Sequence, residues 1–373
     1  NAKAIPPAHV NQPRFTAAYL NRAALRHDRG DLEGAFADYG EALRIEPALP
    51  TALCSRAVVR IEKGDAVGAE EDLREAIRIA PDSATAHLEL GQLQATLGRH
   101  EAAIGLYGEA LRIDPDSARA HFRRANSRGE LGDAAGALAD YDRAIELDPR
   151  YAQAYVNRAS ILLDRDELGR AGADLDEAIR LRPDLVAAWV NRGLLRDRVG
   201  ETRGALDDFN QAIRLDPRSA AALVNRGSLL RGAGAMEPAR RDFDAAILLE
   251  PGLVEAWYNR AHLRRLQGDL QGTLADLTEV VRLSPRLIEG RLLRASVLHE
   301  LGRYAEAIVE CEEAIRLDPR EPQSYSGRGA NRERLGDRAG AIADYERCLA
   351  LAPGNWDGRR EIEGLLAKLR AGE

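Results

Sequence analysis

Proline recurs in this sequence at a fixed distance of 34 residues. The series is Pro13, Pro47, Pro81, Pro115, Pro149, Pro183, Pro217, Pro251, Pro285, Pro319 and Pro353, and no insertion or deletion interrupts it. A period of roughly 20 to 50 residues is the signature of a chain built by stacking copies of one small supersecondary unit. The sequence therefore predicts a repeat protein rather than several unrelated globular domains.

Ten units emerge when each is numbered so that its proline occupies position 32. They start at Thr16, Pro50, Ala84, Ala118, Ala152, Val186, Ala220, Val254, Ile288 and Pro322. Position 8 is Ala or Gly in all ten units, and position 15 is Gly in nine, with Asp166 as the exception. Position 20 is Ala except at Thr273, and position 27 is Ala except at Val280 and Cys348.

These columns predict two antiparallel helices in each unit. A glycine in the middle of the unit ends the first helix, because glycine adopts a positive φ at little cost. Acidic residues often follow it and favour the start of a second helix, which the proline then terminates. The small columns allow the helices to approach closely, so the enlarged residues of unit eight, Thr273 and Val280, make it the expected place for an irregularity.

This pattern resembles the tetratricopeptide repeat family, in its period and in its alternation of small and large residues. The resemblance implies an all-α, right-handed superhelical solenoid whose concave face is lined by first helices. We expect ten units over residues 16–355, a linker or frayed segment over 1–15, and a capping helix within 356–373. Three scattered cysteines, Cys54, Cys311 and Cys348, are expected as small core or groove residues.

An arginine at position 7 accompanies an acid at position 23. Nine units carry both: Arg22 and Asp38, Arg56 and Asp72, Arg124 and Asp140, Arg158 and Asp174, Arg192 and Asp208, Arg226 and Asp242, Arg260 and Asp276, Arg294 and Glu310, and Arg328 and Asp344. Unit three lacks both, with Leu90 and Leu106. A buried guanidinium needs a partner, so we expect a forked ion pair within each of the nine units; a solvated charged face is the alternative.

Asparagine recurs at position 6, at Asn21 and then in four consecutive units at Asn157, Asn191, Asn225 and Asn259, and Arg123 takes this place in unit four. Positions 2, 6, 9 and 13 share one face of the first helix. A primary amide offers a donor and an acceptor to one peptide unit, so a row of amides can hold an extended backbone without reading its sequence. The alternative is that the asparagines tie neighbouring helices together.

The row of asparagines also resembles the repeat superhelix of the O-linked N-acetylglucosamine transferase family. Five further residues are predicted to border the same groove: Asn126, His262, Arg198, Arg231 and Arg265. The partner implied is a protein or an extended peptide. A net charge of −7 disfavours a nucleic-acid partner.

No sequence feature predicts catalysis, a cofactor or a metal. The seven histidines follow no ligand spacing, and neither a phosphate-binding loop nor a nucleophile elbow occurs. No apolar run is long enough for a membrane span, and the first residues lack the apolar stretch of a signal peptide. The chain does not begin with methionine, which leaves open a cytoplasmic location and secretion after signal cleavage.

We therefore expect a non-enzymatic scaffold that binds extended protein segments. Two alternatives remain: the substrate-docking arm of a larger enzyme such as a glycosyltransferase, and a self-associating structural repeat. The sequence does not decide the oligomeric state.

Overall fold

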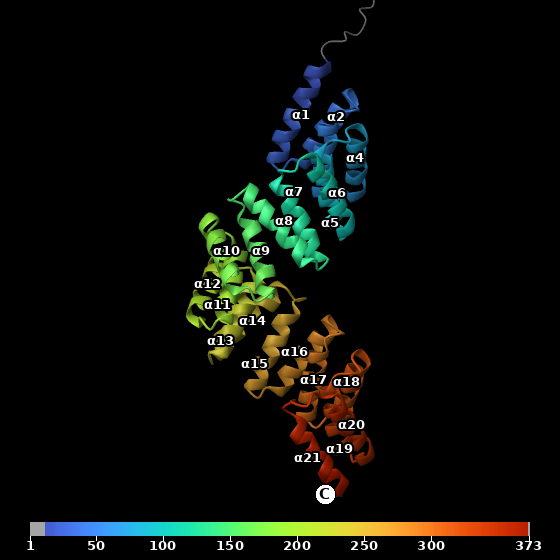
Figure 1. The fold of residues 1–373 in the computed structure, drawn as a ribbon, viewed down its shortest axis with the longest axis vertical. Coiled ribbons are helices and arrows are strands. Elements are labelled where there is room, and N and C mark those ends of the chain that lie inside the picture. Colours follow the sequence, from blue (N-terminus) through green and yellow to red (C-terminus); the bar gives the residue numbers. More distant parts are fainter. Residues whose placement is uncertain (1–11, 372–373) are drawn as a thin grey trace, which may run out of the picture. The chain divides into compact units, whose positions relative to one another are not determined.

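The computed structural model describes residues 12–371, and within this range every regular element is an α-helix (Figure 1). The helices are α1 (Gln12–Asp28), α2 (Leu32–Ile45), α3 (Pro50–Glu62), α4 (Ala66–Ile79), α5 (Ala84–Thr96), α6 (His100–Ile113), α7 (Ala118–Glu130), α8 (Ala134–Leu147), α9 (Ala152–Asp164), α10 (Leu168–Leu181), α11 (Val186–Arg198), α12 (Thr202–Leu215), α13 (Ala220–Gly232), α14 (Met236–Leu249), α15 (Val254–Leu266), α16 (Leu270–Leu283), α17 (Ile288–Glu300), α18 (Tyr304–Leu317), α19 (Pro322–Arg334), α20 (Arg338–Leu351) and α21 (Arg359–Ala371).

The chain is an all-α helical repeat solenoid, as predicted. It divides into two compact units, residues 1–191 and 192–373, with the division inside α11. Within each unit, contacts join helices that are neighbours in sequence and, more sparsely, the first helices of adjacent repeats, such as α3 with α5 and α13 with α15. Each repeat thus packs only against its immediate neighbours, as expected of a solenoid.

One backbone conformation connects the two helices of every repeat. Nine position-15 glycines have φ between 73° and 82°, and the exception, Asp166, adopts the same left-handed region with φ 61°. In the first repeat, Asp31 then accepts a hydrogen bond from the Gly34 amide and caps the second helix. Asp65, Asp133, Asp269 and Asp337 do the same in their repeats.

Small and large residues interlock where the two helices of a repeat cross. Glycine replaces alanine at position 8 in four repeats, and all four have an aromatic ring at position 24. A Cβ atom at Gly193 would lie 2.5 Å from Cε1 of Phe209, and one at Gly227 would lie 2.7 Å from Cε1 of Phe243. Glycine there leaves room for the ring and does not serve a turn, although Ala23 with Tyr39 and Ala125 with Tyr141 show that an aromatic ring also packs against alanine.

The enlarged residues of repeat eight cause no irregularity, contrary to expectation. Its helices, α15 and α16, have the same lengths as the corresponding helices of repeats two to ten, and Thr273 and Val280 are fully buried. Position 3 of repeat nine, which is alanine in the preceding repeats, is Gly290. A Cβ atom on Gly290 would lie 2.8 Å from Cγ1 of Val280, so the extra volume is compensated in the neighbouring repeat.

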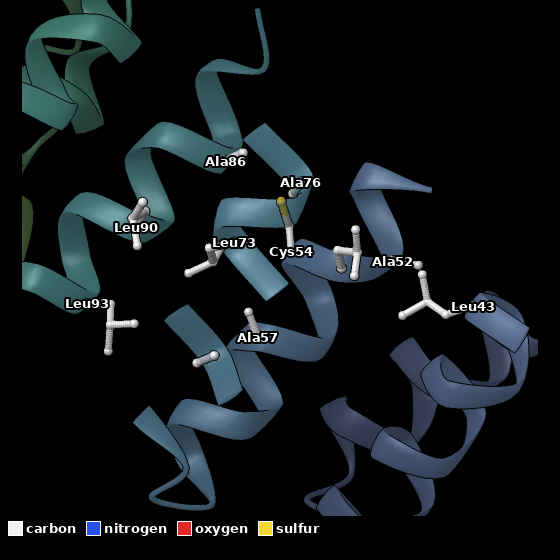
Figure 2. Close-up of a cluster of buried hydrophobic side chains, with 11 residues drawn as sticks. Leu43, Ala52, Cys54, Ala57, Leu73, Ala76, Ala86, Leu90 and Leu93 are labelled. Atoms are coloured by element: carbon white, nitrogen blue, oxygen red, sulfur yellow. The ribbon is translucent and has the colours of Figure 1, made fainter. Parts of the chain in front are cut away.

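The hydrophobic core consists of successive clusters along the chain. One cluster joins Leu43 of α2 to α3, α4 and α5, where Cys54 packs among alanines and leucines (Figure 2). Leu90 belongs to this cluster and Leu106 packs against it, so repeat three replaces the ion pair with an apolar contact. Among the described residues, all three cysteines are buried free thiols.

The two ends differ in detail from the sequence prediction. The first helix already begins at Gln12, although 1–15 is expected as a linker; residues 1–11 lie outside the described range. The last helix begins at Arg359, three residues after Trp356, and covers repeat ten with Ile362, Leu366 and Leu369. The cap residues 372–373 also lie outside that range.

Candidate functional site

Arginine and acid meet within each of the nine repeats that carry both. In eight of them the guanidinium Nε and Nη2 atoms donate to the two carboxylate oxygens of the aspartate, at 2.7 to 3.0 Å and 2.6 to 2.8 Å. The carboxylates are buried, and Arg22 has the most exposed side chain of the nine position-7 arginines. A forked pair of this kind is both strong and directional.

Repeat nine departs from the fork. Arg294 donates only one bond to Glu310, from Nη1 at 2.7 Å, and its Nε has no partner among the described residues. The other oxygen of Glu310 accepts from Arg291 Nη1 at 3.0 Å. Glutamate is one methylene longer than aspartate, so its carboxylate sits differently and recruits the second arginine.

A second arginine, at position 11, was missed by sequence reasoning. Six repeats have it: Arg26, Arg60, Arg128, Arg196, Arg264 and Arg332. Arg128 is typical, because its Nη1 donates to Asp140 at 2.8 Å and to the Gly136 carbonyl at 3.1 Å. The signal was present, since glycine occupies position 19 in the same six repeats and in no other, and a Cβ at Gly136 would lie 3.0 Å from the Arg128 Cδ.

These pairs shift the protonation of their members. The hydrogen bond from Arg22 holds the pKa of Asp38 below its ordinary value. Burial alone would raise the pKa of Asp140, but hydrogen bonds from Arg124 and His121 outweigh it and the pKa is lowered. Asp38 and Asp140 are thus ionised at neutral pH, as their ion pairs require.

The aromatic residue at position 4 of several repeats, three residues before the position-7 arginine, also has a structural role. Trp257 Nε1 donates to the Pro251 carbonyl at 3.0 Å, and the Arg260 guanidinium lies 4.9 Å from its ring. Trp189 donates in the same way to Pro183. Arg359 repeats this contact on Pro353 at 3.4 Å, so the capping helix starts like a further repeat.

The asparagine face consists of positions 2, 6, 9 and 13 of the first helices. All of the predicted groove residues lie on first helices: Asn21 on α1, Arg123 and Asn126 on α7, Asn157 on α9, Asn191 and Arg198 on α11, Asn225 and Arg231 on α13, and Asn259, His262 and Arg265 on α15. Asn21 and Arg198 are exposed, and the others are partly buried.

The amides of this face do not behave alike. Asn157 Nδ2 donates to Asn126 Oδ1 at 2.9 Å, and this contact ties repeat five to repeat four. Asn126 Oδ1 also accepts from the Tyr141 hydroxyl at 2.6 Å. Asn259 Nδ2 donates to the Glu255 carbonyl of its own helix at 2.9 Å. In contrast, the half-buried Asn225 side chain has no partner among the described residues.

The basic residues on and beside the face also differ. Arg265 donates to Ser296 at 3.0 Å and pairs with Glu300. Arg231 Nε is buried and has no partner among the described residues. Burial lowers the pKa of His262, and the charges of Arg231 and Arg265 lower it further. His262 is therefore neutral at pH 7, and Arg231, unlike Arg265, forms no ion pair with an acid among the described residues.

Hollows open along the asparagine face. One of 430 Å³ is lined by the amides of Asn126 and Asn157 together with Glu130 and Ser160. Another, of 520 Å³, lies between α17 and α19, where Gly327 occupies the asparagine position and Cys311 replaces the usual larger residue at position 24.

The tetratricopeptide repeat model matches residues 54–118, 122–186 and 190–252, and a second tetratricopeptide repeat model matches 288–321 and 322–355. The chain belongs to the tetratricopeptide repeat (TPR) family. TPR proteins are generally scaffolds for protein interaction and generally not enzymes. No curated protein sequence matches the chain.

Solved TPR structures show the same fold. A tetratricopeptide repeat protein from Parabacteroides merdae has 22% identity and a TM-score of 0.53, and the match covers 63% of this chain and 93% of that one. PilF of Pseudomonas aeruginosa has 23% identity and a TM-score of 0.51, over 58% and 98%. The human IFIT1 dimer with m7Gppp-AAAA has 15% identity and a TM-score of 0.56, over 92% and 95%.

One further finding concerns membranes. No helix within residues 12–371 combines the length and the apolar content needed to cross a bilayer.

Proposed function

We propose that this TPR protein binds extended segments of partner proteins along the asparagine face. The observation that carries the proposal is the recurrence of a primary amide at position 6 in four consecutive repeats, 34 residues apart. An extended segment presents one N–H and one carbonyl per residue, and an amide can pair with both. Asn225, half-buried and without a partner among the described residues, has this capacity in full.

The interior arginines favour a protein partner over nucleic acid. The position-7 arginines turn inward to acids of their own repeats, so they do not form a basic surface. The net charge of −7 would also repel phosphates. The m7Gppp-AAAA ligand of the IFIT1 structure belongs to that protein.

The proposal is tested by removing the four consecutive amides, Asn157, Asn191, Asn225 and Asn259, together. Peptides selected from a random displayed library on the unmodified chain serve as ligands. The quadruple change to Ala should weaken their binding by roughly tenfold or more, because each lost neutral hydrogen bond contributes about 0.5 to 1.5 kcal/mol. Isothermal titration calorimetry measures the affinity, and circular dichroism shows whether the helices persist.

The matched control is Gln271→Ala, which removes an exposed amide from the second helix of repeat eight. It should leave binding unchanged. If the quadruple variant binds as tightly as the unmodified chain, the asparagine face is not the binding surface. If the variant unfolds while its folded fraction still binds, the asparagines are ties between helices.

A further inference from the structure

A small cavity lies where repeats three and four meet. It has a volume of 190 Å³, and its polar lining includes Gln92 and Thr96 of α5, His100 and Tyr107 of α6, and Arg123 and Glu130 of α7. Gln92, Thr96, Arg123 and Glu130 occupy positions 9, 13, 6 and 13 of first helices. The cavity is therefore on the asparagine face, at the point where arginine replaces asparagine.

Four residues that line this cavity carry buried polar atoms without partners. In the range that the structure describes, eight buried side-chain nitrogen or oxygen atoms lack a hydrogen bond. Four of the eight belong to lining residues: Gln92 Oε1, His100 Nδ1, the Tyr107 hydroxyl and Arg123 Nε. Buried polar groups in native proteins are almost always satisfied, by protein atoms or by ordered water, so four unsatisfied groups on the residues of one cavity favour a polar occupant there.

Neighbouring contacts fix which atom of the Gln92 amide is left without a partner. The Thr96 hydroxyl donates to the Gln92 backbone carbonyl at 3.0 Å, so its oxygen is left to accept from Gln92 Nε2, at 3.3 Å. Gln92 Oε1 therefore remains as an acceptor only. Glu130 adds a second acceptor to the same lining.

Donors come from the other side of the cavity. Arg123 Nε can only donate, and no acid forms an ion pair with Arg123 among the described residues. Tyr107 is fully buried, and burial raises the pKa of Tyr107 to about 12, which keeps its hydroxyl proton available. His100 Nδ1 donates or accepts according to its tautomer.

This combination discriminates between anionic and neutral ligands. A carboxylate only accepts hydrogen bonds, so it would leave Gln92 Oε1 unsatisfied and would place a second negative charge beside Glu130. A carboxamide has an oxygen for Arg123 and Tyr107 and an NH₂ group for Gln92 and Glu130. The cavity also exceeds the share of one water molecule, about 30 Å³ in the liquid, and so has room for such a group.

We propose that the cavity bordered by Gln92, Tyr107 and Arg123 binds the side-chain carboxamide of an asparagine or glutamine in the partner segment. This inference rests on the proposed function, because the carboxamide arrives on a segment lying along the asparagine face. Repeat three is suited to this role, since Leu90 and Leu106 replace its ion pair and no guanidinium at position 7 competes for the ligand.

The test uses Tyr107→Phe, a change that the fold already accepts. Repeats six and seven carry Phe209 and Phe243 at the equivalent position, against Gly193 and Gly227, and repeat three has Gly91 there. Only the hydroxyl is therefore lost. The control is Tyr39→Phe, the same position in repeat one, which does not line this cavity.

Random displayed peptides are selected on the whole chain, on Tyr107→Phe and on Tyr39→Phe. The unmodified chain and the control should enrich peptides containing Gln or Asn at one fixed position. Replacing that residue by Glu or Met in a synthetic peptide should weaken binding roughly tenfold, the effect of losing two neutral hydrogen bonds. On Tyr107→Phe the discrimination should fall to roughly threefold.

Other outcomes overturn the proposal in distinct ways. Enrichment of Asp or Glu that depends on Tyr107 would mean a carboxylate site. Peptides that bind equally to Tyr107→Phe would mean that the cavity takes no part in recognition, although the proposed function would stand. A selection that enriches no peptide on any of the three chains would refute the proposed function together with this inference.

Discussion

Arg226 and Asp242 form the simplest of the interior ion pairs. Repeat seven has Leu230 at position 11, so Asp242 receives only the fork from Arg226, at 2.8 and 2.6 Å. Asp242→Ala should cost roughly 3 to 5 kcal/mol, because the largely buried guanidinium of Arg226 loses its acid and keeps only the neutral Asn210 oxygen. Arg226→Leu with Asp242→Leu, which copies repeat three, should cost far less. Hydrogen exchange of α13 and α14 measures the local stability.

The same experiment in repeat six needs a third change. Asp208 also accepts from Arg196, at 2.8 Å, so replacing Arg192 and Asp208 alone would strand Arg196. We expect that double variant to remain destabilised and the addition of Arg196→Leu to recover part of the loss. Equal exchange in the single and double variants of repeat seven would refute this account of the ion pairs.

Packing at position 8 gives a second prediction at the scale of single residues. Gly227→Ala should cost about 1 to 3 kcal/mol through overpacking against Phe243. Adding Phe243→Leu should remove most of this cost, because repeat five combines Ala159 with Leu175 at the same two positions. Thermal unfolding of the single and double variants checks it; a double variant no more stable than Gly227→Ala would contradict it.

At the scale of the element, glycine has opposite effects in a turn and in a helix. Gly98 ends α5 with φ 73°, whereas Gly108 lies inside α6, and a Cβ at either would meet no atom within 4 Å. Gly98→Ala should destabilise by about 1 to 2 kcal/mol, because an L-residue strains in the left-handed region. Gly108→Ala should stabilise by about 0.5 to 1 kcal/mol. Denaturant midpoints of the two variants compare these signs directly.

The helices could be predicted from the sequence because the same helix pair is encoded ten times, so that the ten repeats can be aligned and compared position by position. Ten aligned copies make a helix-ending glycine visible as a column, and the joint loss at Leu90 and Leu106 reveals the ion pair. The position-11 arginine could not be found by looking for pairs of opposite charges. The residue that varies together with it is the glycine at position 19, which offers a backbone carbonyl and leaves space for the arginine side chain. The cavity at Tyr107 could not be predicted. It is recognised by polar atoms that lack hydrogen-bond partners, and whether an atom has a partner depends on the folded structure and not on a pattern of residue types.

At the scale of the whole molecule, the lowered pKa values predict sensitivity to acid. A depressed folded-state pKa stabilises the native state above the unfolded value of about 3.9, and this contribution is lost as the pH falls through the folded value. Since Asp38 and Asp140 have lowered pKa values, stability should be flat near neutrality and decrease below about pH 4. On acidification, the backbone amides of α5 and α6, whose repeat has no such pair, should lose less protection from hydrogen exchange than those of α7 and α8. An equal loss of protection in the two repeats would show that the ion pairs are not the source of the acid sensitivity.

The arginine at position 11 alternates along most of the chain. Repeats four, six, eight and ten have it together with the glycine at position 19, and repeats five, seven and nine have leucine there. The true period of this region is thus two repeats, 68 residues, which is what a gene lengthened by copying two repeats at a time would encode. Removing residues 186–253 deletes two repeats and would preserve the alternation of arginine and leucine at position 11. Removing residues 186–219 deletes one repeat and would place two repeats with leucine at position 11 side by side.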